Sequence, residues 1–128
     1  MAVATNSVAV TGPMANHCTA ITPWQVNATS AAAADCELIV AAPGTGYVLV
    51  VTRLVIYIGA AITVTIGSGK SGSAVEAVVI GPLGGAAGTY PLDCRARPIV
   101  LTTNKSLSFD ASGAGAVCIY AEGFTKLA

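Results

Sequence analysis

The sequence contains very little charge. Asp, Glu, Lys and Arg make up 9% of its 128 residues, and six basic side chains balance six acidic ones. A soluble domain ordinarily carries about a quarter charged residues. Because the chain has no net positive field, we expect neither nucleic acid nor an anionic membrane as a partner. Since 54% of the residues are hydrophobic, we expect much of the surface to contact other protein.

No apolar run is long enough to cross a membrane as a helix. The most apolar stretch, residues 38–66, is interrupted by Pro43, Gly44, Gly46 and Arg53, whereas a membrane-spanning helix needs about 18 consecutive apolar residues. Its valine, isoleucine and threonine residues favour strands instead. No Lys or Arg precedes Arg53, so the charged start of a secretory signal is missing, and we expect the mature chain to begin near Met1.

Histidine and closely spaced cysteine residues, which often mark metal or catalytic sites, are scarce. His17 is the only histidine, and no C-x-x-C pair occurs among the four cysteines, Cys18, Cys36, Cys94 and Cys118. A His17/Cys18 dyad has no carboxylate near it in the sequence to orient it. We therefore predict no enzyme activity, no metal and no cofactor. Without a secretion signal we also expect four free, mostly buried thiols.

The segment GSGKS, residues 67–71, matches only the end of a phosphate-binding loop. The full motif, G-x-x-x-x-G-K-[ST], needs a leading glycine where this sequence has Val64. A helix should follow the motif, but the next segment, AVEAVVI, is typical of a strand. We therefore interpret Lys70 and its glycine and serine neighbours as the tip of a β-hairpin.

Strands dominate the chain from residue 36 onward, and regularly spaced turn residues separate them. In the long run YVLVVTRLVIYI, residues 47–58, both odd and even positions are apolar. Because strand side chains alternate between faces, we expect one face in a sandwich core and the other against a neighbouring subunit. The predicted subunit face holds the odd positions, Tyr47, Leu49, Val51, Arg53, Val55 and Tyr57. An exposed strand end is the alternative for Arg53.

Residues 1–35 differ from the rest of the chain. They contain no charged residue before Asp35, and they carry the only tryptophan, Trp24. We expect residues 1–35 to form an arm docked on a partner, with Trp24 as its anchor and AVATNSVAV, residues 2–10, able to extend a neighbouring sheet. Residues 36–128 would then form the β-sandwich domain. The alternative is that the arm supplies the first strands of that same domain.

Several segments after residue 38 together resemble the small β-sandwich head decoration, or cement, proteins of tailed bacteriophages. They are the turn Pro43-Gly44, the link Gly81-Pro82-Leu83, the strand start at residues 104–107 and the final strand at residues 120–124. The resemblance implies a single jelly-roll-like β-sandwich that forms a homotrimer on the virion surface. Its partner would be the major capsid protein, bound from outside after assembly in the host cytoplasm. A phage tail or fibre component for host attachment is the alternative.

Overall fold

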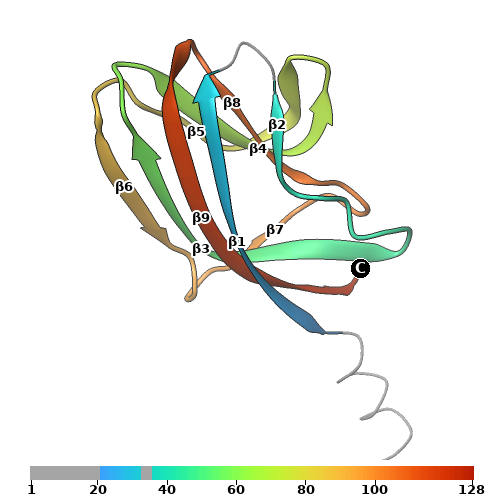
Figure 1. Cartoon of the computed structure of the whole chain (residues 1–128). Coiled ribbons are helices and arrows are strands. Elements are labelled where there is room, and N and C mark those ends of the chain that lie inside the picture. Colours follow the sequence, from blue (N-terminus) through green and yellow to red (C-terminus); the bar gives the residue numbers. More distant parts are fainter. Residues whose placement is uncertain (1–20, 33–35) are drawn as a thin grey trace, which may run out of the picture.

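Strands account for all of the regular structure in residues 21–32 and 36–128, the part of the chain that the computed structural model describes (Figure 1). They are β1 (Thr22–Ala32), β2 (Glu37–Val40), β3 (Tyr47–Ile58), β4 (Thr63–Ser71), β5 (Ala74–Gly84), β6 (Gly88–Asp93), β7 (Ile99–Val100), β8 (Leu107–Ala111) and β9 (Ala114–Leu127). The apolar run predicted as a strand over residues 47–58 is β3, with the same bounds.

The strands form two antiparallel sheets that pack face to face. The first sheet has the order β1-β9-β3-β6, with β7 also paired to β3, and the second has the order β2-β8-β4-β5. With the strands other than β7 lettered B to I along the chain, these orders are B-I-D-G and C-H-E-F. That is the strand order of a jelly roll. The predicted all-β, jelly-roll-like sandwich is confirmed.

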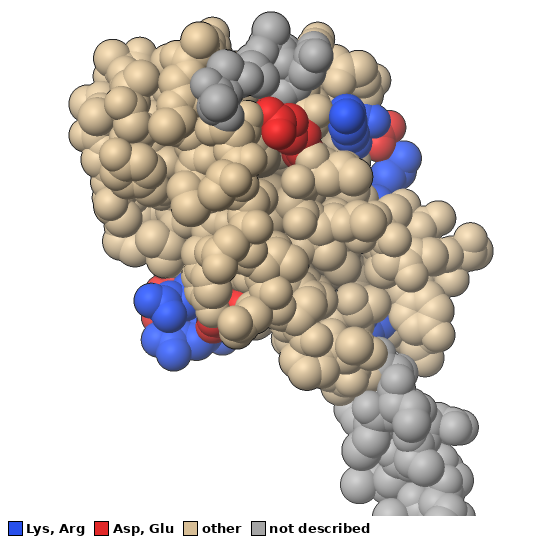
Figure 2. Space-filling view, in the orientation of Figure 1, with Lys and Arg blue, Asp and Glu red and all other residues tan. Residues whose placement is uncertain are grey.

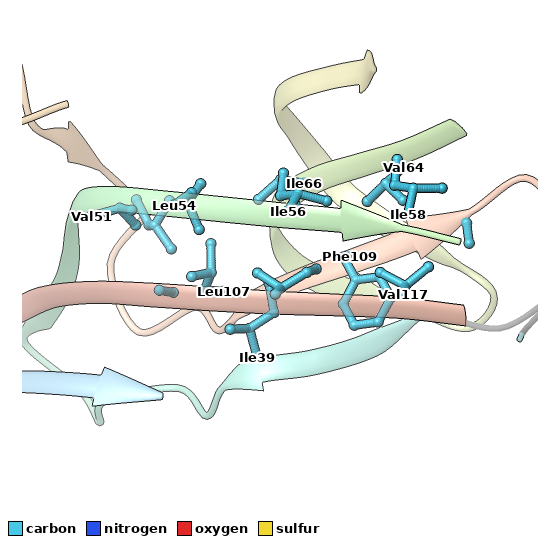
Figure 3. Packing of buried hydrophobic residues seen from close by; sticks show 14 of the residues in the cluster. Ile39, Val51, Leu54, Ile56, Ile58, Val64, Ile66, Leu107, Phe109 and Val117 are labelled. Carbon is cyan, nitrogen blue, oxygen red and sulfur yellow. The ribbon is translucent and has the colours of Figure 1, made fainter. Parts of the chain in front are cut away.

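The hydrophobic core lies between the two sheets (Figure 3). The first sheet contributes mainly through β3 and β9, and the second through β4 and β8. Phe109 of β8 is among the fully buried side chains, and Figure 3 shows it beside Val117 of β9. The core side chains with no exposed surface are Leu54, Ile56, Ile58, Val64, Ile66, Leu107, Ile119 and Ala121.

A β-bulge at Thr52 interrupts β3. Along β9, the successive residues Gly123 and Glu122 pair with Val51 and Arg53, so Thr52 is an extra residue in the ladder. The Thr52 hydroxyl donates a hydrogen bond of 3.1 Å to the Glu122 carbonyl. An extra residue in one strand shifts the alternation of its side chains by one position.

This shift changes which residues of β3 face the core. Leu49 and Val51 before the bulge point to the same core as Leu54, Ile56 and Ile58 after it. The prediction that all odd positions share a subunit face is therefore wrong. Leu49 and Val51, each 1% exposed, belong to the chain's own core.

Residues 22–32 belong to the sandwich, so the predicted boundary between residues 35 and 36 is wrong for them. They form β1, which pairs with β9 from Thr22 opposite Thr125 to Ser30 opposite Val117. For this stretch the alternative holds, because its alternate apolar side chains, Trp24, Val26 and Ala28, pack against the core. The segment AVATNSVAV, His17 and Cys18 lie outside the described residues.

The GSGKS segment lies in the β4–β5 hairpin. Lys70 is exposed and pairs with Val75, and the chain turns back between Ser71 and Ala74. Gly69 has a positive φ of 84°, a conformation that glycine adopts without strain. The segment is followed by strand β5 and not by the helix N-terminus that holds phosphate in such loops. The predicted hairpin is confirmed, but its turn is formed by Gly72 and Ser73, and Lys70 lies just before it in β4.

Candidate interaction surface

The outward side of the first sheet is the candidate functional surface, which we call the outer sheet face. In each of its four long strands, alternate residues enter the core and leave the others pointing away. Twelve outward positions follow: Gln25, Asn27, Thr29, Arg53, Val55, Tyr57, Thr89, Pro91, Asp93, Cys118, Tyr120 and Glu122.

These positions form three rows across the strands, and only one row is charged. The strand register aligns Gln25, Glu122, Arg53 and Asp93 in that row. The other rows are Asn27-Tyr120-Val55-Pro91 and Thr29-Cys118-Tyr57-Thr89. Two adjoining rows without charge, containing two tyrosines and a valine, resemble the apolar centre of a protein interface more than an ordinary wet sheet face.

Figure 2 shows that uncharged surface is extensive on the side of the molecule in view. Most of the visible charged side chains gather at two places on the rim of a wide uncharged area. The same contrast is seen within the outer sheet face, where the charged row lies to one side of the two neutral rows. A neutral centre with charge at its border is the usual arrangement in protein interfaces.

Tyr120 links the charged row to the neutral rows. Its hydroxyl donates a hydrogen bond of 2.5 Å to Oε2 of Glu122 and lies 3.5 Å from Oε1 of Gln25. The hydrogen bond to Glu122 raises the pKa of Tyr120, with smaller contributions from desolvation and from the negative charge of Glu122. A tyrosine phenol is protonated at neutral pH even without this shift, so Tyr120 can donate its hydrogen bond to Glu122 there.

The exposed pair Asp93 and Arg95 ends the charged row. The Arg95 guanidinium donates two hydrogen bonds to the Asp93 carboxylate, from Nε to Oδ1 at 2.9 Å and from Nη2 to Oδ2 at 2.7 Å. The Arg95 backbone N–H donates a third at 3.0 Å. The side-chain bonds, and after them the backbone bond, lower the pKa of Asp93 from an ordinary 3.8 to about 2.

We predict that Arg95→Ala raises the Asp93 pKa toward 3.8, because it removes the largest cause of the shift. The folded-state pKa is the lower one, so the stabilisation is present above pH 3.8 and is lost as the pH falls toward 2. Carboxyl NMR titration of both proteins measures the shift. Arg97→Ala is the control and should leave the Asp93 pKa unchanged. An unchanged Asp93 pKa in Arg95→Ala would contradict the assignment.

Three cysteines lie in the described residues, and all three are free thiols. Cys36 is 1% exposed, and its pKa is raised by burial first and by the charge of Asp110 second. Cys94 and Cys118 are half-buried, and burial also raises the pKa of Cys94. The expectation of mostly buried thiols therefore holds for Cys36 alone among them.

We predict that iodoacetamide labels Cys118 in the folded protein at least ~10-fold faster than Cys36. The thiolate is the nucleophile, and both burial and a raised pKa suppress it at Cys36. Peptide mass spectrometry after timed labelling at pH ~8 measures the two rates. In denaturant the two residues should label alike. Equal rates in the folded protein would show that the Cys36 region opens readily.

The structure separates the residues that the sequence proposed for partner binding. Arg53, Val55 and Tyr57 lie on the outer sheet face, and Arg53 is exposed between Glu122 and Asp93 in the register. Tyr47, at the start of β3, is 38% exposed. Leu49 and Val51 are core residues. Trp24 is half-buried, and it packs against the hydrophobic core of its own chain, close to Gly123. Whether any of them binds a partner stays a prediction.

Sequence reasoning missed the contributions of β1, β6 and β9 to this surface. Tyr120 and Cys118 alternate with the apolar residues Val117, Ile119 and Ala121, so the period of two in β9 marked them as outward-facing. No local signal placed them beside Val55 and Tyr57, because that neighbourhood comes from the pairing of β9 with β3.

The described residues contain no group of three or more His, Cys, Asp or Glu side chains that could hold a metal ion. Within the same ranges, 21–32 and 36–128, no helix has the length and apolar character to cross a membrane.

Comparison with known proteins gives only distant similarities. No protein-family model matches the chain, and neither does any curated protein. Among solved structures, this chain is similar to a chain from Bacillus endospore appendages, described as a family of disulfide-linked pili. The two chains are 15% identical with a TM-score of 0.43, and the match covers 84% of this chain and 88% of that chain. A chain from infectious bursal disease virus, Gx strain, has 15% identity and a TM-score of 0.29, with coverage of 85% of this chain and 35% of that chain.

Proposed function

We propose that this chain is a structural protein that acts as a repeated subunit of a large protein assembly. More specifically, we propose a decoration protein that binds the outside of a bacteriophage capsid and stabilises the shell. The observation that carries the proposal is the outer sheet face, with its two uncharged rows centred on Val55, Tyr57 and Tyr120. The sequence resemblance to phage decoration proteins supplies the particular assembly.

The physical argument concerns the exposed apolar surface. Tyr57 is 49% exposed, and a lone soluble domain rarely keeps such side chains together in adjoining rows that lack charge. Covering them with another protein removes apolar area from water and leaves the charged row at the interface rim. Many copies, each making such a modest contact, together stabilise a shell strongly through multivalency.

A decoration protein needs no active site, because it acts only by binding: the free energy of its interfaces stabilises the shell. Each subunit would bridge neighbouring capsid proteins and add contact area that resists the pressure of packaged DNA. A homotrimer would make three such contacts at once. The partners in this proposal are therefore the major capsid protein and further copies of the chain itself.

The first test is the copy number of the chain in purified virions of the phage that encodes it. Quantitative mass spectrometry should find it at a level comparable to the major capsid protein. A few copies per particle would support the tail or fibre alternative and overturn capsid decoration. Absence from the virions would overturn both.

The second test is binding of the purified protein to undecorated capsids. Tyr57→Asp should weaken binding at least ~10-fold, because it places a charge at the centre of the neutral rows. The matched control is Val78→Asp, which introduces the same charge at a residue that is 61% exposed on β5 of the other sheet. Co-sedimentation measures both affinities. Equal binding by the two variants would exclude the outer sheet face as the capsid contact.

A further inference from the structure

Strand β1 forms an open edge of the first sheet. Among the described residues its only partner strand is β9, although β1 is eleven residues long. Its C-terminal end lies near β2, where the Ser30 hydroxyl donates a hydrogen bond to Glu37. The part that precedes Ser30 runs on along the sheet edge beyond the four-residue β2 (Figure 1). Within the described residues, no strand other than β9 pairs with residues 22–29 of β1, which leaves one side of this part of β1 as a sheet edge.

The other three sheet edges carry features that oppose strand addition, and β1 does not. β6 is six residues long and has Pro91 in its middle, and β2 is four residues long and includes Glu37. The β4–β5 ladder has two register shifts, and β5 contains Pro82. β1 has no charged residue, and its one proline stands at its second position. It therefore lacks the usual protection of a free edge.

Among the described strands, only β9 lies beside the inward side chains of β1 within the first sheet. Trp24, Val26 and Ala28 pack against the core but are only partly buried. The indole Nε1 of Trp24 is the buried side-chain polar atom without a hydrogen-bond partner in the described residues. A buried donor without an acceptor costs about 1–3 kcal/mol. An added strand would cover the three side chains and bring further carbonyl groups to this edge.

We propose that the open edge of β1 accepts residues 2–10 of a second copy of this chain as an added strand. Twenty residues precede the described structure, which begins at Ile21, next to the start of β1. Residues 2–10 contain no charge and no proline, and include the β-branched Val3, Thr5, Val8 and Val10. This segment of nine residues is long enough to cover residues 22–29, the part of β1 that precedes Ser30. Main-chain hydrogen bonds would provide the affinity, as in other cases of β-augmentation.

The donor is a second copy because, within one chain, the link between residues 2–10 and β1 is longer than a usual hairpin loop. To pair with its own β1, the segment would have to return through residues 11–20, whereas hairpin loops are usually about 2–5 residues long. The same ten residues, when extended, reach roughly 33 Å, enough to meet a neighbouring subunit. A contact between the donor segment of one copy and the β1 edge of the next joins the copies head to tail. Three copies joined in this way can form a closed ring. This inference extends the proposed function, since it supplies the contact between the subunits.

Complementation between two variants tests the inference with the full chain. The donor variant is Ser7→Pro with Val8→Pro, which removes two successive backbone N–H groups. Because successive N–H groups of a strand point to opposite sides, one of the two would face the acceptor strand, and its hydrogen bond would be lost. In the acceptor variant, Val26→Lys, the side chain starts on the inward face of β1, but because Val26 is only partly buried the lysine can reach solvent past the open edge. An added strand would close that route and bury the charge. The controls are Ser7→Thr with Val8→Thr, and Val26→Ile. Thermal unfolding verifies that each variant is folded, and Ala28→Lys replaces Val26→Lys if the latter is not.

Native mass spectrometry gives the outcome. The wild type and both controls should be oligomers, each variant alone a monomer, and their equimolar mixture a dimer with one chain of each kind. A monomeric wild type, a donor variant that still oligomerises, or a mixture that stays monomeric would each overturn the inference. Capsid binding is measured separately through Tyr57→Asp, so a wild-type protein that is monomeric but still binds capsids would overturn this inference and leave the proposed function standing.

Discussion

Replacing Phe109 with alanine should lower the free energy of unfolding by about 3–5 kcal/mol. Phe109 is 2% exposed and is one of the largest buried side chains. It extends from β8 into the core between the sheets, where Val117 lies beside it (Figure 3). Alanine would lose the transfer free energy of the ring and leave a cavity that two hydrogen-bonded sheets cannot close by collapsing.

Urea unfolding of the wild type and Phe109→Ala measures this effect. The matched control is Val78→Ala, at a residue that is 61% exposed, which should change the unfolding free energy by no more than about 0.5 kcal/mol. A loss below about 1 kcal/mol in Phe109→Ala would mean that the site repacks, and that the core is less tightly ordered than the structure shows.

The substitution Gly123→Ala should destabilise the protein by about 1–3 kcal/mol or more. Gly123 lies in β9 opposite Val51, next to the bulge at Thr52. A Cβ atom there would lie 2.0 Å from the Val50 carbonyl oxygen and 2.9 Å from Cζ2 of Trp24. The first contact is with backbone, so no change of side-chain rotamer relieves it, and the β3–β9 pairing itself must move.

Gly88→Ala is the matched control, since Gly88 is also a strand residue of the first sheet. An added Cβ there meets no atom nearer than the Tyr90 ring at 3.8 Å, which is an ordinary van der Waals contact. We expect little change in its unfolding free energy. Thermal and urea unfolding compare the two variants with the wild type. Equal stability of the two would contradict the close approach of β3 and β9 at the bulge.

The fold class was accessible from the sequence because strand formation leaves a local pattern. The β-branched run at residues 47–58 and the glycine and serine turn at residues 67–73 gave β3 and the β4–β5 hairpin directly. The status of residues 22–32 was less clear, because their small, uncharged residues suit a docked arm as well as an edge strand. Pairing with β9, far away in the sequence, decided it.

The candidate surface could be predicted only in part. Arg53, Val55 and Tyr57 were found as outward residues from their alternation, but the same reasoning placed Leu49 and Val51 with them. The apolar residues of β3 fit either face equally well, so the sequence did not show where alternation shifts. The shift arises because Thr52 has no counterpart in β9, which is a property of the pair of strands.

By itself, the sequence determined that the chain forms β-strands, has little charge to cover its surface and carries the turn residues for tight hairpins. These properties depend on residue type and on neighbours along the chain. Only the tertiary structure decided which side chains share a face and which strand is left as an open edge. It also decided where the bulge in β3 shifts the alternation of side chains between the two faces. These features depend on strand register and sheet order, which are set by contacts between segments as distant as β1 and β9.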